Sequence, residues 1–386
     1  MSIKKIKIVE NSGDEKLYFS GRSIEVHTTK NSNISPGRCS TTKEYTSLMN
    51  IPAQRVSIQD FISIIPRKLF RKNLNPFIKD NGIHKQIADY LIKKIPSTRY
   101  SSIILSPIIL PKINELDFKL YETFSRRSLF IQNYVKESLG KVKNEFLPSL
   151  FIAQNLSLKN IESLFNNMSQ SDCWVPVIPL YMPKKNFQKA VNLSLSKVGT
   201  YQVPMILFVY SDPLKNLDNY DYIWNNNSKE IIFSVCDAPR EKMNELSTSH
   251  YLHPLGIDYI GRRVHHIGGP GKKSEIPQYL RVKYFNKNNL TINTENNISE
   301  NIDILQDLPY DNRIKTVFDN REKANTNQEL NVLKSISNVH EFYSSSNEFK
   351  RVSKFTKNKE YGEYLKGKKI LNDVVNLFSQ SKISNK

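Results

Sequence analysis

Short apolar runs alternate with segments of helical periodicity from residue 100 onward. Near-continuous apolarity, without polar residues at every second position, is typical of strands that are buried on both faces of a parallel sheet. We therefore predict six parallel strands covered by helices. The runs span residues 102–106, 147–153, 174–182, 203–211, 230–237 and 256–264.

The segments between these runs repeat apolar residues at intervals of three and four positions, which predicts amphipathic helices. The longest covers residues 114–140, with Asn114 as its N-cap and Gly140 at its end. Ser157 is expected to cap the next helix. Residues 187–198 predict a third helix, and residues 83–95 predict one that precedes the first run.

Consecutive strand–helix units joined by right-handed crossovers form either a (β/α) barrel or an open, doubly wound sheet. We favour an α/β fold with a barrel-like centre, because no glycine-rich dinucleotide fingerprint follows the first strand. Residues 5–9 and 23–27 are expected to supply the missing barrel strands. The open sheet remains the alternative.

Composition divides the chain into four regions. A basic segment with helical character covers residues 1–99, and the barrel-like core covers 100–285. Residues 286–311 are rich in Asn and then in acids, which is typical of a linker. A small, basic, helical extension is predicted over residues 312–386.

The formal net charge of +19 is concentrated in the flanks. It is +10 over residues 1–99, +3 over 100–270 and +6 over 271–386. Basic residues interleaved with aromatics, as in 67–99 and 350–369, suit a nucleic-acid backbone with exposed bases. The alternative is a set of solvated helix faces in a Lys-rich chain.

Several classes of protein are disfavoured. No run reaches the ~18 uncharged apolar residues of a membrane span, and the first residues lack the pattern of a secretory signal, so we expect a cytoplasmic protein without a membrane partner. The widely separated Cys39, Cys173 and Cys236 argue against a disulfide framework and a Cys-based metal cluster. No motif identifies a cofactor.

Asp237 is the strongest candidate for a catalytic carboxylate. It ends the apolar run 230–237, and ligands of parallel α/β folds bind at the carboxyl ends of the strands. A carboxylate there can act as a nucleophile or a general base. The alternative is an ordinary loop opening that caps a helix. Other polar residues expected at strand ends are Ser106, Gln154, Tyr181, Ser211 and Asp212.

A histidine-rich and glycine-rich stretch follows the last run. We assign His265 and His266 to the reacting group together with Asp237. A glycine-rich backbone with flanking cations suits a phosphate, although the strict P-loop spacing is absent. The residues assigned to phosphate are Arg262, Arg263, Gly268, Gly269, Gly271, Lys272 and Lys273.

The same stretch admits two other interpretations. One is a glycine turn with a solvated basic rim that leaves the domain. The other is a metal site built from His250, His253, His265 or His266 with Asp237, although no third ligand is marked. Our prediction contains no metal.

Three hypotheses for function follow. The first is a barrel enzyme that transfers or modifies a base or nucleotide of a nucleic acid, with RNA or tRNA favoured over DNA. The second is a non-catalytic nucleic-acid-binding or scaffold protein on a degenerate barrel, and the third is an enzyme for a small anionic metabolite. The Asp-Ser-Gly-Gly signature and the Cys/His zinc cluster of tRNA-guanine transglycosylases are absent, so we assign no family.

Overall fold

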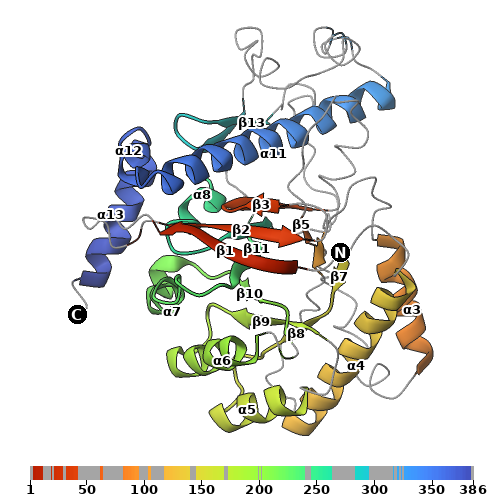
Figure 1. Ribbon diagram of the computed structural model, residues 1–386. Coiled ribbons are helices and arrows are strands. Elements are labelled where there is room, and N and C mark those ends of the chain that lie inside the picture. Colours follow the sequence, from red (N-terminus) through yellow and green to blue (C-terminus); the bar gives the residue numbers. More distant parts are fainter. Residues whose placement is uncertain are drawn as a thin grey trace.

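The protein is built on a parallel β-sheet flanked by helices (Figure 1). A computed structural model describes residues 3–11, 19, 21–28, 32–41, 61–63, 81–94, 103–105, 117–139, 145–168, 173–198, 200, 202–239, 245–262, 283–294, 316, 320, 323 and 326–383. Within these residues no helix combines the length and the apolarity that crossing a bilayer requires.

Six parallel strands form the centre of the sheet. Their hydrogen-bonded order is β8 (Ser149–Phe151), β9 (Val175–Pro179), β10 (Met205–Val209), β11 (Ile232–Ala238), β12 (Tyr259–Arg262) and β4 (Gly37–Thr41). Five of these strands, β8 to β12, fall on apolar runs that the sequence predicts as strands, because burial on both faces leaves few polar positions, whereas β4 lies outside every run. The remaining run, 102–106, contains the strand Ile103–Leu105.

The order continues from β4 to three short parallel strands. These are β5 (Phe61–Ser63), β6 (Ile103–Leu105) and β7 (Glu145–Leu147). β7 and β8 lie at opposite ends of the order, yet only Pro148 separates them in sequence. The Pro148 carbonyl accepts a hydrogen bond from the Val175 N–H at 2.8 Å, so the proline itself contacts β9.

The prediction that residues 5–9 and 23–27 belong to the parallel strands is wrong. They lie in β1 (Ile3–Asn11) and β2 (Arg22–Thr28), which pair antiparallel with each other. β2 also pairs antiparallel with β3 (Ser32–Ile34). The apolar side chains of β1 and β2 alternate with charged ones, as suits strands with one face toward solvent. The parallel strands from the first 99 residues are β4 and β5.

Helices connect the parallel strands. They are α3 (Asn81–Lys94), α4 (Phe118–Ser138), α5 (Leu158–Asn167), α6 (Lys184–Lys197), α7 (Leu217–Trp224) and α8 (Thr248–Leu252). Ser157 caps α5 as predicted, because its hydroxyl accepts a hydrogen bond from the Asn160 N–H at 3.2 Å. The N-cap of α4 is Asp117, and the predicted boundaries Asn114 and Gly140 lie outside the described residues.

The last part of the chain packs around a smaller apolar cluster. A hairpin, β13 (Lys283–Asn286) and β14 (Thr291–Thr294), lies against α11 (Asn327–Lys357), α12 (Tyr361–Lys366) and α13 (Lys369–Ile383). The predicted linker, residues 286–311, begins inside this hairpin, and residues 295–311 lie outside the described part of the chain.

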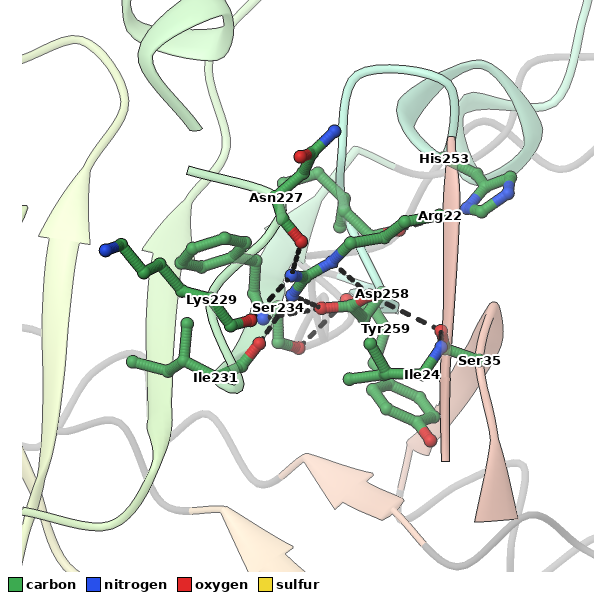
Figure 2. A network of polar contacts seen from close by, with 12 residues as sticks. Arg22, Ile24, Ser35, Asn227, Lys229, Ile231, Ser234, His253, Asp258 and Tyr259 are labelled. Atoms are coloured by element: carbon green, nitrogen blue, oxygen red, sulfur yellow. Dashed lines mark hydrogen bonds and ion pairs between the residues drawn. The ribbon is translucent and has the colours of Figure 1, made fainter. Parts of the chain in front are cut away.

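A buried arginine joins the N-terminal sheet to the parallel sheet (Figure 2). Arg22, the first residue of β2, donates to both carboxylate oxygens of Asp258, from Nε at 3.0 Å and from Nη2 at 2.5 Å. Its Nη1 donates to the carbonyls of Asn227 (2.6 Å) and Lys229 (3.0 Å), and Nη2 also donates to that of Ile231. All five N–H donors of the guanidinium are therefore satisfied.

Both carboxylate oxygens of Asp258 likewise have hydrogen-bond partners. Its carboxylate also accepts from the Phe233 N–H at 2.8 Å and from the Ser35 hydroxyl at 3.3 Å. Asp258 directly precedes β12, and the three carbonyls bound by Arg22 precede β11. The ion pair therefore holds β2 against the amino ends of two parallel strands.

Replacing Arg22 by Ala should lower the free energy of unfolding by about 3–5 kcal/mol, because it leaves the buried Asp258 carboxylate without its cation. Arg126→Ala is the matched control, since Arg126 is exposed and its ion pair with Glu122 should contribute about 1 kcal/mol or less. Urea denaturation measures both, and Arg22→Lys serves if the alanine variant does not fold. Equal losses for an Arg22 variant and Arg126→Ala would contradict the structural role of the buried pair.

Candidate functional site

Asp237 lies where the sequence predicts it, at the carboxyl end of a parallel strand. It is the penultimate residue of β11, whose residues are all buried. The side chain retains only 5% of its accessible surface. A carboxylate so placed has little contact with water but stands at the edge of the sheet where ligands of parallel α/β folds bind.

A β-bulge surrounds Asp237. The register pairs Val235 with Ile260, whereas the next pair is Ala238 with Arg262. Two residues of β11, Cys236 and Asp237, therefore lie opposite the single residue Gly261. A bulge interrupts the alternation of side chains and redirects them, and bulges are frequent beside active sites.

The neighbours across the bulge are small. Gly261 has no side chain, and on its other side it pairs with Cys39 of β4. Asp237, Gly261 and Cys39 therefore lie at the same level on three adjacent strands, near the carboxyl edge of the sheet.

Of the other residues assigned to the reacting group or to phosphate, only Arg262 is described. It ends β12, and its backbone pairs with Ala238, directly after Asp237. The structure thus brings the ends of β11 and β12 together. The remaining predicted residues lie outside the described part of the chain: Arg263, His265, His266, Gly268, Gly269, Gly271, Lys272 and Lys273.

Two polar residues that follow β10 have local structural roles. Asp212 accepts a hydrogen bond from the Leu214 N–H at 3.1 Å and so caps the 3₁₀-helix η1 (Pro213–Lys215). The Ser211 hydroxyl accepts a hydrogen bond from the Asn216 side-chain amide at 2.6 Å. Both side chains therefore stabilise the loop that follows β10.

The same edge holds a pair of tyrosines that sequence reasoning missed. The hydroxyl of Tyr210, which follows β10, lies 2.7 Å from that of Tyr251 in α8. Each residue is only partly buried. Their separation by 41 positions leaves no local signal in the sequence.

His250 and His253 are packed in places that do not suit a metal site with Asp237. The His250 ring stacks between Phe285 and Phe349, with centroid distances of 5.0 and 4.4 Å. His253 lies beside Arg22 at the opposite, amino edge (Figure 2). No group of three His, Cys, Asp or Glu side chains able to hold a metal ion occurs among the residues that the structure describes.

Burial, together with the charge of Arg22, lowers the pKa of His253 from 6.5 to about 4. The ring's Nδ1 lies 3.4 Å from the Ile257 carbonyl, which opposes the shift. His253 is therefore neutral in the folded protein at neutral pH.

No protein-family model and no curated protein matches this sequence. The interpretation of the site therefore rests on its geometry and chemistry.

Acidification should destabilise the protein through His253. In the unfolded chain His253 is protonated below about pH 6.5, whereas in the folded protein it is protonated only below about pH 4. The free energy of unfolding therefore falls as the pH is lowered across this window. The loss attributable to His253 is roughly 3 kcal/mol at pH 4. Urea denaturation between pH 7 and pH 4 should show a shallower pH dependence for His253→Gln than for the parent.

His27→Gln is the control for that series, since His27 is partly exposed on β2. It should keep the parental slope. A His253→Gln variant with the parental slope would show that another group accounts for the acid sensitivity.

Proposed function

We propose that the parallel strands close into a (β/α) barrel. The support is the continuity of β7 and β8 through Pro148, because one chain segment pairs with β6 on one side and with β9 on the other. In a sheet whose two ends are one segment, closure satisfies both hydrogen-bonding edges.

Side-chain burial supports closure independently. Phe208 packs on Phe187 of α6, so its neighbours Leu207 and Val209 point away from that helix. Leu207, with its register partners Val177 and Ser234, is almost fully buried. A barrel interior filled by side chains accounts for this burial.

We propose further that the protein is an enzyme that acts on a base or nucleotide of RNA or tRNA at the carboxyl ends of these strands. The observation that carries this proposal is the buried carboxylate of Asp237 in a bulge opposite Gly261. Partial desolvation strengthens the interaction of a carboxylate with a reacting group. Asp237 acts as the nucleophile or general base.

In this proposal, residues at the end of β12 and after it contact the reacting group and bind phosphate. Because Arg262 pairs with Ala238, the residues that follow it start one strand away from Asp237. We assign His265 and His266 to the reacting group. Phosphate binding is assigned to Arg262, Arg263, Gly268, Gly269, Gly271, Lys272 and Lys273, whose backbone and cations suit an anion.

The charge distribution supports a polyanionic substrate. Helix α3 (Asn81–Lys94) buries Ile87 and Leu91, and it exposes Lys85 and Lys93. Its apolar stripe therefore packs as the sequence predicts, while lysines from the basic flank remain available at the surface. Released counterions would make such binding strongly dependent on salt.

Asp237→Asn should separate binding from chemistry. We expect the parent protein to bind tRNA with an affinity that falls steeply as salt rises, and to change the nucleoside composition of bulk tRNA incubated with the small-molecule fraction of a cell extract. Mass spectrometry of the digested tRNA detects that change. The variant should bind equally well but react at least about 10²-fold more slowly.

Asp212→Asn is the matched control, because Asp212 also follows a strand of this edge but caps η1. It should keep both activities. Salt-sensitive tRNA binding without any altered nucleoside would favour the scaffold alternative, and undetectable tRNA binding at low salt would contradict both nucleic-acid hypotheses. An unchanged rate for Asp237→Asn would remove its catalytic role.

A further inference from the structure

A cavity of about 690 Å³ lies beside the carboxyl ends of β9 and β10. Its walls come from the loop after β9, the first turns of α6 and α7, η1, and the end of α13. This volume suits a small organic ligand. The polar side chains that matter below are Tyr181, Lys184, Lys215, Asp218, Asn219 and Lys382.

One part of the lining consists of hydrogen-bond donors. Helix α6 starts after Pro183, which has no side-chain acceptor for the free N–H groups of the first turn. Asn216, the N-cap of α7, uses its side-chain amide to donate to Ser211 instead of capping the helix. Lys184 and Lys215 add positive charge at these two helix starts.

Another part of the lining consists of acceptors. The Asn219 side-chain amide donates to the carbonyls of Leu180 and Met182, both at 2.8 Å, and these bonds fix its orientation. Its Oδ1 is buried and has no hydrogen-bond partner among the described residues. Because Asn219 lines the cavity and is only 3% exposed, a ligand hydroxyl is a suitable donor to this oxygen.

Ion pairs between distant elements hold this lining in place. Lys382 of α13 lies 2.8 Å from the Asp218 carboxylate and 2.9 Å from that of Asp221. Lys184 lies 3.2 Å from Asp218. Hydrogen bonds from Lys382 and Lys184 lower the pKa of Asp218, so it is a carboxylate at neutral pH.

One lysine in the lining of the cavity is not balanced by a carboxylate and can bind an anion. Asp218 and Asp221 balance Lys184 and Lys382, whereas no carboxylate of the described chain forms an ion pair with Lys215. The half-exposed Tyr181 ring provides an apolar surface at the same opening. The cavity thus offers donors for an anion and acceptors for hydroxyl groups.

We propose that this cavity binds a phosphate ester with neighbouring hydroxyl groups, as found in nucleoside monophosphates and sugar phosphates. The phosphate lies between the first turns of α6 and α7 and contacts Lys215. A hydroxyl donates to Asn219 Oδ1. This inference rests on the proposed function, because it adds a phosphate subsite to the edge that carries Asp237.

Isothermal titration calorimetry with adenosine 5′-monophosphate tests the proposal directly. Lys215→Ala should weaken binding about tenfold through loss of a charged hydrogen bond to the phosphate. Adenosine without phosphate and the 2′,3′-dideoxy monophosphate should each bind more weakly than the monophosphate. Glucose 6-phosphate, compared in the same titration, distinguishes a nucleoside ligand from a sugar ligand.

Lys159→Ala is the matched control. Lys159 is an exposed lysine in the first turn of α5, whose N-terminus Ser157 already caps. It should leave binding unchanged. Failure of both phosphate esters to bind, or equal affinity for the Lys215→Ala variant, would overturn the inference.

The outcome is separable from that of the proposed function. If neither phosphate ester binds but Asp237→Asn abolishes modification of tRNA, only the cavity assignment fails. If it binds at a Lys215-dependent site and no chemistry on tRNA is found, the cavity assignment stands and the proposed reaction fails.

Discussion

The ion pair between Arg22 and Asp258 is the contact on which the arrangement of the sheets depends. Both side chains are fully buried, and an isolated charge in such a place would be strongly destabilising. Pairing offsets part of that penalty, because every guanidinium donor and both carboxylate oxygens have partners, although burial still raises the pKa of Asp258. The interaction therefore requires β2, the loop before β11 and the start of β12 to be in place together.

This contact gives the two edges of the parallel sheet different roles. At the amino edge, Gly21 adopts a positive φ of +74° and lies so close to His253 that a Cβ would stand 2.5 Å from the ring Nε2. Only glycine satisfies both conditions without a shift of the ring. The amino edge is thus packed by the N-terminal sheet, whereas the carboxyl edge holds the Asp237 bulge and the cavity.

Local patterns in the sequence predicted the elements well and their partners poorly. The runs that became β8–β12 were visible because burial on both faces leaves a continuous apolar signature. Ser157 was predictable because capping involves residues three positions apart. The alternation of apolar and polar residues in 5–9 and 23–27 is typical of strands with one face toward solvent, which a strand of a parallel barrel does not have.

In the candidate site, too, the local features were predictable from the sequence and the long-range contacts were not. Asp237 could be located because it follows an apolar run, but the bulge depends on the register between β11 and β12, which one strand does not encode. Arg22 and Asp258 are 236 positions apart, and Lys382 and Asp218 are 164 apart. Contacts at such separations have no periodic signature, so neither the closed amino edge nor the cavity was predictable.

Hydrogen exchange in the presence and absence of tRNA is the most direct test of the claim that the carboxyl edge is the functional one. The account predicts slower amide exchange after β9, β10 and β11 when tRNA is bound, in residues 180–183, 210–216 and 238–239. Exchange in residues 22–28 and 254–258, at the amino edge, should not change. Protection confined to those amino-edge residues would contradict the account.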